Sequence, residues 1–217
     1  YAFTRQFINT YLMTDGTPFT SKYPDYDDLD LVAECTDRDY RLAQTIRTPG
    51  FTRDGGTTQW APDVKFSKTG YQPIKWLTDD SSKDTNVAAI ASDVPLIRYA
   101  EVLLAYAEAK AELGEMSEEV WDKTIKPLRE RAGFDAAYCS YPGSSDLRQI
   151  IRDERRVELA LEGRRVFDLR RWALLDNPSL KSTGATYLTT RATGAPFLDD
   201  GSNIQCQNAY GMKYWFP

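Results

Sequence analysis

The stretch LIRYAEVLLAYAEAKAELG, residues 96–114, decides the fold class of this chain. Apolar side chains recur in it at the three- and four-residue spacing of one helix face, at Leu96, Tyr99 or Ala100, Leu103 and Ala107. Gly114 supplies a stop signal, because glycine readily takes the left-handed conformation that ends a helix. The pattern predicts a long helix whose alanines allow a second helix to approach closely.

A second helix is predicted within SEEVWDKTIKPLRERAGF, residues 117–134. Ser117 is a candidate N-cap and Gly133 a candidate stop. Pro127 lies inside the segment, and because proline lacks a backbone N–H, this helix is predicted to be kinked or to start late. The two segments together have the length of one tetratricopeptide unit, although the tryptophan and glycine pattern of that repeat is missing.

A third helix is predicted within SSDLRQIIRDERRVELALEG, residues 144–163, with Ser144 or Ser145 as its cap and Gly163 as its end. The apolar side chains expected on one face of it are Leu147, Ile150, Ile151, Val157 and Leu161. The following VFDLRRWALL, residues 166–175, predicts a short fourth helix.

The rest of the chain has the composition of turns and loops. Residues 1–95 are rich in Thr, Asp, Gly, Pro and Tyr, which is typical of long loops, and they form the candidate ligand-binding region. Residues 96–175 are the tetratricopeptide-like helical region, and residues 176–217 form an irregular C-terminal region of short strands or coil. The predicted fold class is mainly α: tetratricopeptide-like helical hairpins with long irregular loops and a few short strands.

A single helical hairpin cannot bury its apolar face alone and must stack on further helices. This chain does not contain enough of them, so its three regions are expected to belong to one larger domain whose N-terminal portion is absent here. The start at Tyr1, without a signal peptide, fits a processed or excised piece. Apolar runs stay well short of the ~20 residues that a membrane helix needs.

Charge and residue usage exclude several classes of function. Lys and Arg number 27 against 32 Asp and Glu, a net charge of -5, which argues against a nucleic-acid partner. Histidine is absent, which removes Ser–His and Cys–His nucleophile pairs and His-bearing metal sites. Cys35, Cys139 and Cys206 are widely spaced, so they allow at most one disulfide bridge and no common zinc site.

Acidic residues raise the possibilities of hydrolysis and of calcium binding. A glycoside hydrolase needs two carboxyl groups flanking the bond, but the glutamates from 154 to 162 lie among arginines, which keep a carboxyl pKa low and spoil a general acid. No catalytic residue is therefore predicted. The acidic segment at 24–31 lacks the central glycine and the closing glutamate of an EF-hand. The turns at 79–84 and 199–203 are rich in oxygen ligands, but such turns are usually only solvated, so no metal or cofactor is predicted and a structural calcium ion stays an open alternative.

The run from Glu154 to Arg171 interleaves both signs of charge and predicts structural ion pairs. Glu158 and Glu162 fall on one helix face and need cationic partners, for which Arg155 and Arg165 are within reach. A site for an anion or phosphate is the functional alternative.

The loop FTRDGGTTQW, residues 51–60, is the candidate binding site. Sugar recognition needs a flat ring against the C–H face of the sugar and polar groups that reach its hydroxyls. Trp60 is the principal candidate for the ring. The other candidates are Phe51, Arg53, Asp54 and Gln59.

Five segments resemble the SusD/RagB family. The runs IRYAEVLLAYAEA (97–109) and ERRVELALEGRRVFDLRRW (154–172) are close to its signature segments and stand in the same order, with RAG at 131–133 between them. DRDYRL (37–42) is similar to the family's RDPRL, with Tyr40 in place of proline. LMTDGTPF (12–19) and TGYQPIKW (69–76) also resemble family segments.

The resemblance implies a tetratricopeptide-like scaffold with glycan-binding loops, in a surface lipoprotein of a Gram-negative outer membrane. It implies non-catalytic binding of poly- or oligosaccharides for a SusC-like TonB-dependent transporter, with anchoring through an N-terminal lipid outside this chain. Two alternatives stay open: a tetratricopeptide-type protein-interaction scaffold, suggested by the helical hairpin alone, and a glycoside hydrolase.

Overall fold

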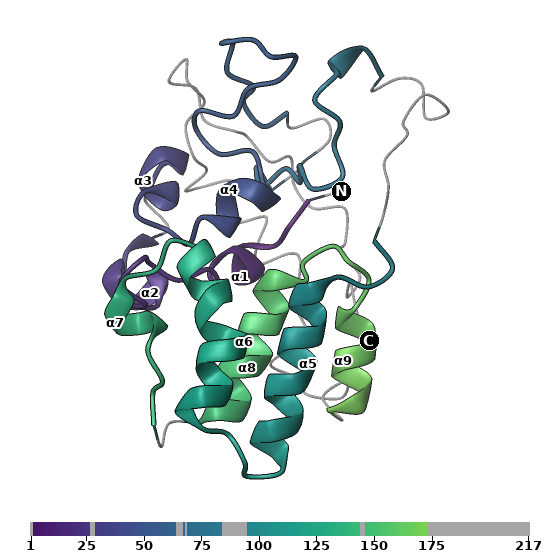
Figure 1. Cartoon of the computed structure of the whole chain (residues 1–217). Coiled ribbons are helices and arrows are strands. Elements are labelled where there is room, and N and C mark those ends of the chain that lie inside the picture. The colour runs from purple at the N-terminus through teal and green to yellow at the C-terminus, as the bar shows by residue number, and fades with distance from the viewer. Residues whose placement is uncertain are drawn as a thin grey trace.

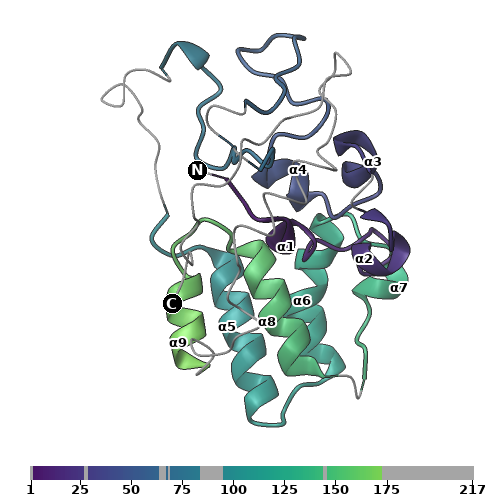
Figure 2. The same ribbon diagram turned by 180° about the vertical axis from the view of Figure 1, so that it is seen from behind.

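The computed structural model describes residues 2–26, 29–63, 67, 69–83, 95–143 and 146–172. Its helical layer consists of α5 (Tyr99–Glu112), α6 (Glu118–Arg131), α8 (Leu147–Glu158) and α9 (Arg165–Arg171), which stand side by side in Figures 1 and 2. The irregular part lies across one end of this layer. It contains α1 (Arg5–Ile8), α2 (Phe19–Lys22), α3 (Leu31–Cys35), α4 (Arg41–Thr45) and the 3-10 turn η2 (Ser81–Lys83), and the short α7 (Ala136–Cys139) follows α6.

The predicted mainly α class is confirmed. Within the described ranges, strand pairing is limited to isolated bridges, at Met13–Arg38, Ile46–Pro73 and Thr52–Gln59. The irregular region predicted over 176–217 lies outside the described residues. No helix of the described part combines the length and the apolar character that crossing a membrane requires.

One hydrophobic core lies between α5, α6 and α8. Trp121 of α6 is fully buried at its centre, and its indole N–H donates to the Cys139 carbonyl at 2.8 Å. The cluster comprises Ala100, Leu104, Ala107, Trp121, Ile125, Leu128, Ile151 and Leu159. The third helix therefore covers the predicted hairpin from within this chain.

The buried face of α5 overlaps the predicted one, because Ala100 and Ala107 are buried as predicted and Leu103 packs partly buried against the core. Leu96 and Tyr99 are 85% and 74% exposed, whereas Ala100, Leu104 and Ala107 form the buried stripe. The two alanines allow α6 and α8 to approach closely, and Leu104 fills the space between them.

The helix ends also test the sequence signals. Ser117 caps α6 as predicted, since its Oγ accepts from the Val120 N–H at 3.3 Å. The helix starts at Glu118 and contains Pro127, so the late start is wrong. The cap of α8 is Asp146, whose carboxylate accepts from the Gln149 N–H at 3.2 Å. Ser144 and Ser145, the predicted caps, lie outside the described residues.

The third helix ends earlier than predicted, and it joins two cores. It stops at Glu158, five residues before Gly163, and Leu161 is 44% exposed in a left-handed conformation. Ile151 packs in the first core, while Val157 belongs to a second one under the irregular part. This second cluster comprises Ile8, Tyr11, Leu31, Leu42, Ile46, Tyr71 and Val157.

Candidate functional site

The predicted binding loop doubles back as a hairpin that is closed by a single isolated bridge. Thr52 and Gln59 pair in an antiparallel bridge, and the Trp60 N–H donates to the Phe51 carbonyl at 2.8 Å. The side-chain Oε1 of Gln59 accepts from the Gly50 N–H at 3.1 Å, which closes the base of the hairpin. The two aromatic residues therefore lie opposite one another on adjacent chain segments.

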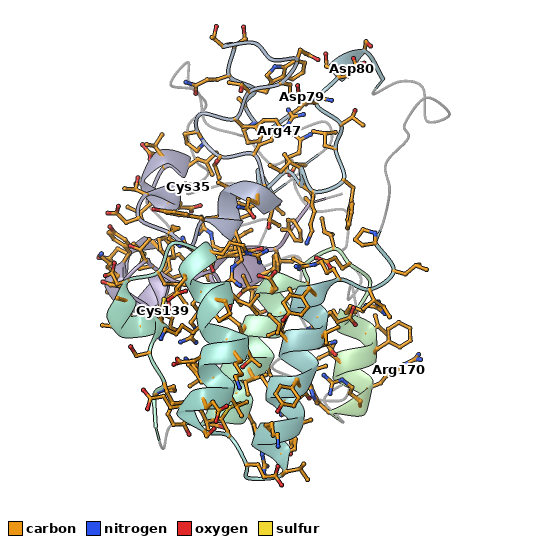
Figure 3. All side chains as sticks on the ribbon, viewed as in Figure 1. Cys35, Arg47, Asp79, Asp80, Cys139 and Arg170 are labelled. Atoms are coloured by element: carbon orange, nitrogen blue, oxygen red, sulfur yellow. The ribbon has the colours of Figure 1, made fainter. Side chains whose placement is uncertain are left out.

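The tip of the hairpin is attached to the segment at residues 79–81. Asp54, at φ +61°, donates its N–H to the Asp79 carbonyl at 2.9 Å, and its Oδ1 accepts from the Ser81 N–H at 2.6 Å. Hydrogen bonds from Ser81 hold the pKa of Asp54 below its usual value. Gly55 adds an N–H bond to Asp79 Oδ2 at 3.2 Å. Figure 3 labels Asp79 in this outer end of the irregular part.

Two guanidinium groups lie beside the half-buried ring of Trp60. Those of Arg53 and Arg47 are 5.3 and 5.7 Å from its centroid, which is cation–π distance. The Arg53 guanidinium also donates to the Thr78 carbonyl at 2.7 Å, and that of Arg47 to the Ala61 carbonyl at 3.0 Å. These two contacts restrict the orientation of the ring.

The structure brings all five predicted residues into this one hairpin. Their roles in it differ from the expected ones, because Arg53, Asp54 and Gln59 already make hydrogen bonds within the loop and to residues 78–81. Arg53 is only 3% exposed, whereas Asp54 and Gln59 reach solvent. The rings of Phe51 and Trp60 remain the candidate contact surface, and their assignment stays a prediction.

Arg47 is a member of this site that the sequence interpretation missed. It is 7% exposed and lies 5.7 Å from the centroids of both Phe51 and Trp60. Figure 3 labels it in the irregular part, between α4 and the outer loops. In the sequence, Arg47 stands four residues before Phe51 and next to a Thr-Pro-Gly turn, which could have suggested that it lies near the loop. Its contact with Trp60 could not be predicted, because it depends on how that turn folds.

A buried ion-pair network fixes the irregular part to the helical layer. Arg41 of α4 bonds Asp39 at 2.7 Å, and it reaches Glu154 at 2.6 Å and Glu158 at 2.9 Å, both in α8. Glu154 is also paired with Arg129 of α6 at 3.1 Å. The charged run is therefore structural, as predicted, and it positions the segment that leads into the hairpin.

The partners of the two glutamates differ from the expected ones. Glu158 pairs with Arg41, Arg98 and Arg131, and Glu162 pairs with Arg98 at 2.7 Å and with Lys75 at 2.5 Å. Arg155 instead bonds Asp168 at 2.8 Å. Arg165 makes no ion pair with another described residue, and burial together with the nearby charge of Arg156 lowers its pKa to about 10.

We predict that Glu158 makes the protein sensitive to acid. Burial alone would raise its pKa, but Arg41 and the hydrogen bonds from Arg131 and Arg98 outweigh it and lower the pKa from 4.5 to about 2. A depressed folded-state pKa contributes stability that is fully present above about pH 4.5 and is lost as the pH falls towards 2. This contribution is about 3 kcal/mol.

Chemical denaturation of the wild type and Glu158→Gln between pH 5 and pH 2 measures it. The wild type should lose about 3 kcal/mol more unfolding free energy than the variant. Burial raises the pKa of Asp39 in both proteins, so its opposite effect largely cancels in the difference. Equal losses in the two proteins would show that Glu158 is not the acid-sensitive group.

Metal ligands do not cluster in the described part: no three Cys, Asp or Glu side chains there could hold an ion together. The turn predicted at 79–84 is described up to Lys83, and in it Asp80 Oδ1 accepts from the Ser82 N–H and hydroxyl at 3.0 and 2.6 Å. The acidic turn at 24–31 is described only in part, and that at 199–203 lies outside the described residues.

Comparison with known proteins gives one consistent family. Two SusD-like proteins of Formosa agariphila are each 28% identical, over 172 and 151 residues, with 73% and 63% of this chain covered. A SusD-like protein of Bacteroides fragilis superimposes with a TM-score of 0.63 at 30% identity over 80% of this chain. A SusD-like carbohydrate-binding protein of the same organism superimposes with a TM-score of 0.63 at 30% identity, over 99% of this chain.

The chain spans 30% and 29% of the lengths of the two Formosa proteins, and 36% and 44% of the two Bacteroides chains. The family model for the SusD family matches residues 1–215, nearly the whole sequence. With the helical fold and the segments at 97–109 and 154–172 in place, this match shows that the chain belongs to the SusD family.

Proposed function

We propose that this protein binds poly- or oligosaccharides without cleaving them. The observation that carries the proposal is the hairpin at residues 50–60, in which the half-buried Trp60 lies opposite Phe51 with the guanidinium groups of two arginines against its ring. A ring that is ordered before binding loses little entropy when a sugar stacks on it. One structural relative with 30% identity is a carbohydrate-binding protein, which supports the ligand class.

The arrangement of carboxylates supports binding over hydrolysis. The glutamates of α8 pair with arginines, and Glu158 has a pKa of about 2, so it stays ionised at neutral pH and cannot act as a general acid. At the hairpin, Asp54 is held ionised by Ser81. The proposed role is therefore capture of the glycan alone.

The place of action we propose is the outer surface of a Gram-negative outer membrane. There the protein is anchored by an N-terminal lipid outside this chain and delivers its glycan to a SusC-like TonB-dependent transporter. Family membership supports this role. A signal peptide ending at a cysteine in the open reading frame that contains this chain is the expected companion feature.

Replacing Trp60 tests the site. Trp60→Ala in the full-length protein should weaken binding of the preferred glycan about ten-fold, because it removes the stacking surface. Isothermal titration calorimetry measures the change, and Trp60→Phe, which keeps a ring, should lose far less.

Tyr106→Ala is the matched control for Trp60→Ala. Tyr106 is an aromatic residue of α5 that is 48% exposed and lies in the helical layer, away from the hairpin. Its replacement should leave glycan affinity unchanged. If Trp60→Ala also leaves the affinity for every bound glycan unchanged, the assignment of the site to the hairpin is wrong.

A further inference from the structure

A pocket of about 470 Å³ opens at the base of the hairpin. Its walls come from the end of α3, the turn at residues 36–40 and the residues that follow α6. Its volume lies in the range of small-molecule sites, about 300–1,000 Å³. Cys35, one of its lining residues, is labelled in Figure 3 at the end of α3.

Tyr40 provides an aromatic surface on this pocket. Its side chain is 59% exposed, and its ring lies against Gly133, where a Cβ atom would come within 2.4 Å of Cε2. Its backbone N–H donates to the Ala132 carbonyl at 2.9 Å. The ring therefore packs against Gly133, and the hydrogen bond holds the backbone of Tyr40 in place. More than half of the side chain still faces solvent. Tyr40 is also the residue that replaces the proline of the family-like segment 37–42.

Two exposed carboxylates, those of Asp37 and Asp135, line the same pocket. The backbone of Thr14 connects them: its N–H donates to the Asp37 carbonyl at 2.9 Å, and its carbonyl accepts from the Asp135 N–H at 2.8 Å. Asp37 is held at φ +53°, in the left-handed region. Neither carboxylate forms a hydrogen bond or ion pair with another residue of the described part, so both can accept from a ligand.

The buried charged side chains of the pocket wall already have partners within the protein. The guanidinium of Arg38 donates to the carbonyls of Glu34, Ile8 and Tyr11 at 2.8 to 2.9 Å. Asp39 is paired with Arg41. The charge presented to a ligand is therefore that of the two exposed carboxylates, which repel acidic sugars and accept hydrogen bonds from sugar hydroxyls.

The pocket and the hairpin adjoin one another along the chain. Thr48 and Pro49 line the pocket, and Gly50, the next residue, donates to Gln59 at the base of the hairpin. The Cα atoms of Pro49 and Phe51 are two residues apart in the chain, so at most ~7.6 Å separates them. The edge of the pocket and the start of the hairpin therefore lie close enough for one oligosaccharide to span the distance between them.

We propose that this pocket is a second sugar-binding subsite, which takes an uncharged sugar residue of the glycan chain that stacks on Trp60. The ring of Tyr40 is the platform for the C–H face of the sugar, and Asp37 and Asp135 accept from its hydroxyls. The subsite rests on the glycan binding proposed above, and it selects neutral over acidic sugars.

The test is calorimetric titration of the full-length protein with maltohexaose, mannohexaose, xylohexaose and cellohexaose, and with oligogalacturonic acid as the acidic probe. Tyr40→Ala should weaken binding of the preferred neutral hexasaccharide about ten-fold, while Tyr40→Phe keeps the ring and should bind nearly as well as the wild type. Asp37→Asn should weaken it roughly five-fold, because asparagine tolerates the left-handed backbone but lacks the charge.

Alkylation of Cys35 gives a second readout that needs no substitution. Cys35 is half-buried at the pocket wall, whereas Cys139 is only 1% exposed. Peptide mapping after N-ethylmaleimide treatment should show that the bound hexasaccharide slows modification of Cys35 several-fold. Cys139 should react slowly with or without the sugar.

The outcomes separate the subsite from the proposed function. If the wild type binds a hexasaccharide, but Tyr40→Ala and the Cys35 reaction rate are unaffected, the subsite is overturned while glycan binding stands. Tighter binding of oligogalacturonic acid than of every neutral probe also overturns it. If the wild type binds no glycan at all, the proposed function fails and the subsite falls with it.

Discussion

Arg41→Met should lower the unfolding free energy of the protein by about 3–5 kcal/mol. Arg41 is 6% exposed and bonds Asp39, Glu154 and Glu158. Glu154 and Glu158 keep other arginines when it is removed, but Asp39 loses the ion pair that it makes with Arg41. Breaking a buried ion pair by removing one side leaves an uncompensated charge, and this desolvated charge accounts for the large cost.

Denaturation of the full-length protein in urea measures this loss. The unfolding free energy of Arg41→Lys should lie between those of the wild type and Arg41→Met. Lysine keeps the charge but lacks the planar guanidinium group that reaches several carboxylates. Lys123→Met is the control, since it breaks an exposed pair with Glu119 and should leave the midpoint unchanged. Equal midpoints for Arg41→Met and Lys123→Met would mean that the network does not hold the irregular part to the helices.

Trp121→Ala should cost about 3–5 kcal/mol of unfolding free energy, the usual loss for truncating a fully buried aromatic side chain. Trp121 is 0% exposed at the centre of the core between α5, α6 and α8, and its N–H bonds the Cys139 carbonyl. The alanine variant therefore leaves both a cavity and an unpaired carbonyl.

Trp121→Phe separates the two contributions in the same denaturation experiment. It keeps most of the volume and loses the hydrogen bond, so it should cost about 1–3 kcal/mol, the penalty of an unsatisfied buried acceptor. A loss below about 1 kcal/mol for Trp121→Ala would contradict a core centred on this residue.

Local features of the helices could be predicted from the sequence. The helix containing residues 99–112 follows from its apolar spacing, and the cap at Ser117 from the residue type alone. The buried face of α5 was predicted in part, since Ala100 and Ala107 belong to it. The burial of Leu104 and the exposure of Leu96 and Tyr99 could not be predicted, because apolar side chains lie on both faces of the helix and only the packing of α6 and α8 selects between them.

Contacts between distant segments were the part that sequence patterns could not provide. Helical spacing suggests Arg155 and Arg165 as partners of Glu158 and Glu162. Such spacing identifies only pairs of residues that are close in the sequence. The observed partner Arg41 lies more than a hundred residues away in the sequence, on α4. The resemblance to the family identified the segments at 37–42 and 154–172, but it did not predict the ion pairs between them.

The sequence predicted that the candidate site is a loop, but it did not predict the contacts that this loop makes. Glycines and the aromatic pair at 51 and 60 indicated a turn-rich binding segment, and the hairpin brings the predicted residues together. That Asp54 would attach the tip to Ser81 depended on a segment 27 residues further on. The pocket beside Tyr40 likewise joins residues 14, 37, 40 and 135, which no local pattern connects.

The most direct test of glycan capture is native affinity electrophoresis of the full-length protein in gels that contain one polysaccharide each, with release of reducing sugar followed in parallel. We expect slower migration on one or a few glycans and no release of reducing ends. Unchanged migration on every polysaccharide would contradict glycan binding, and release of reducing sugar would show that the protein is an enzyme.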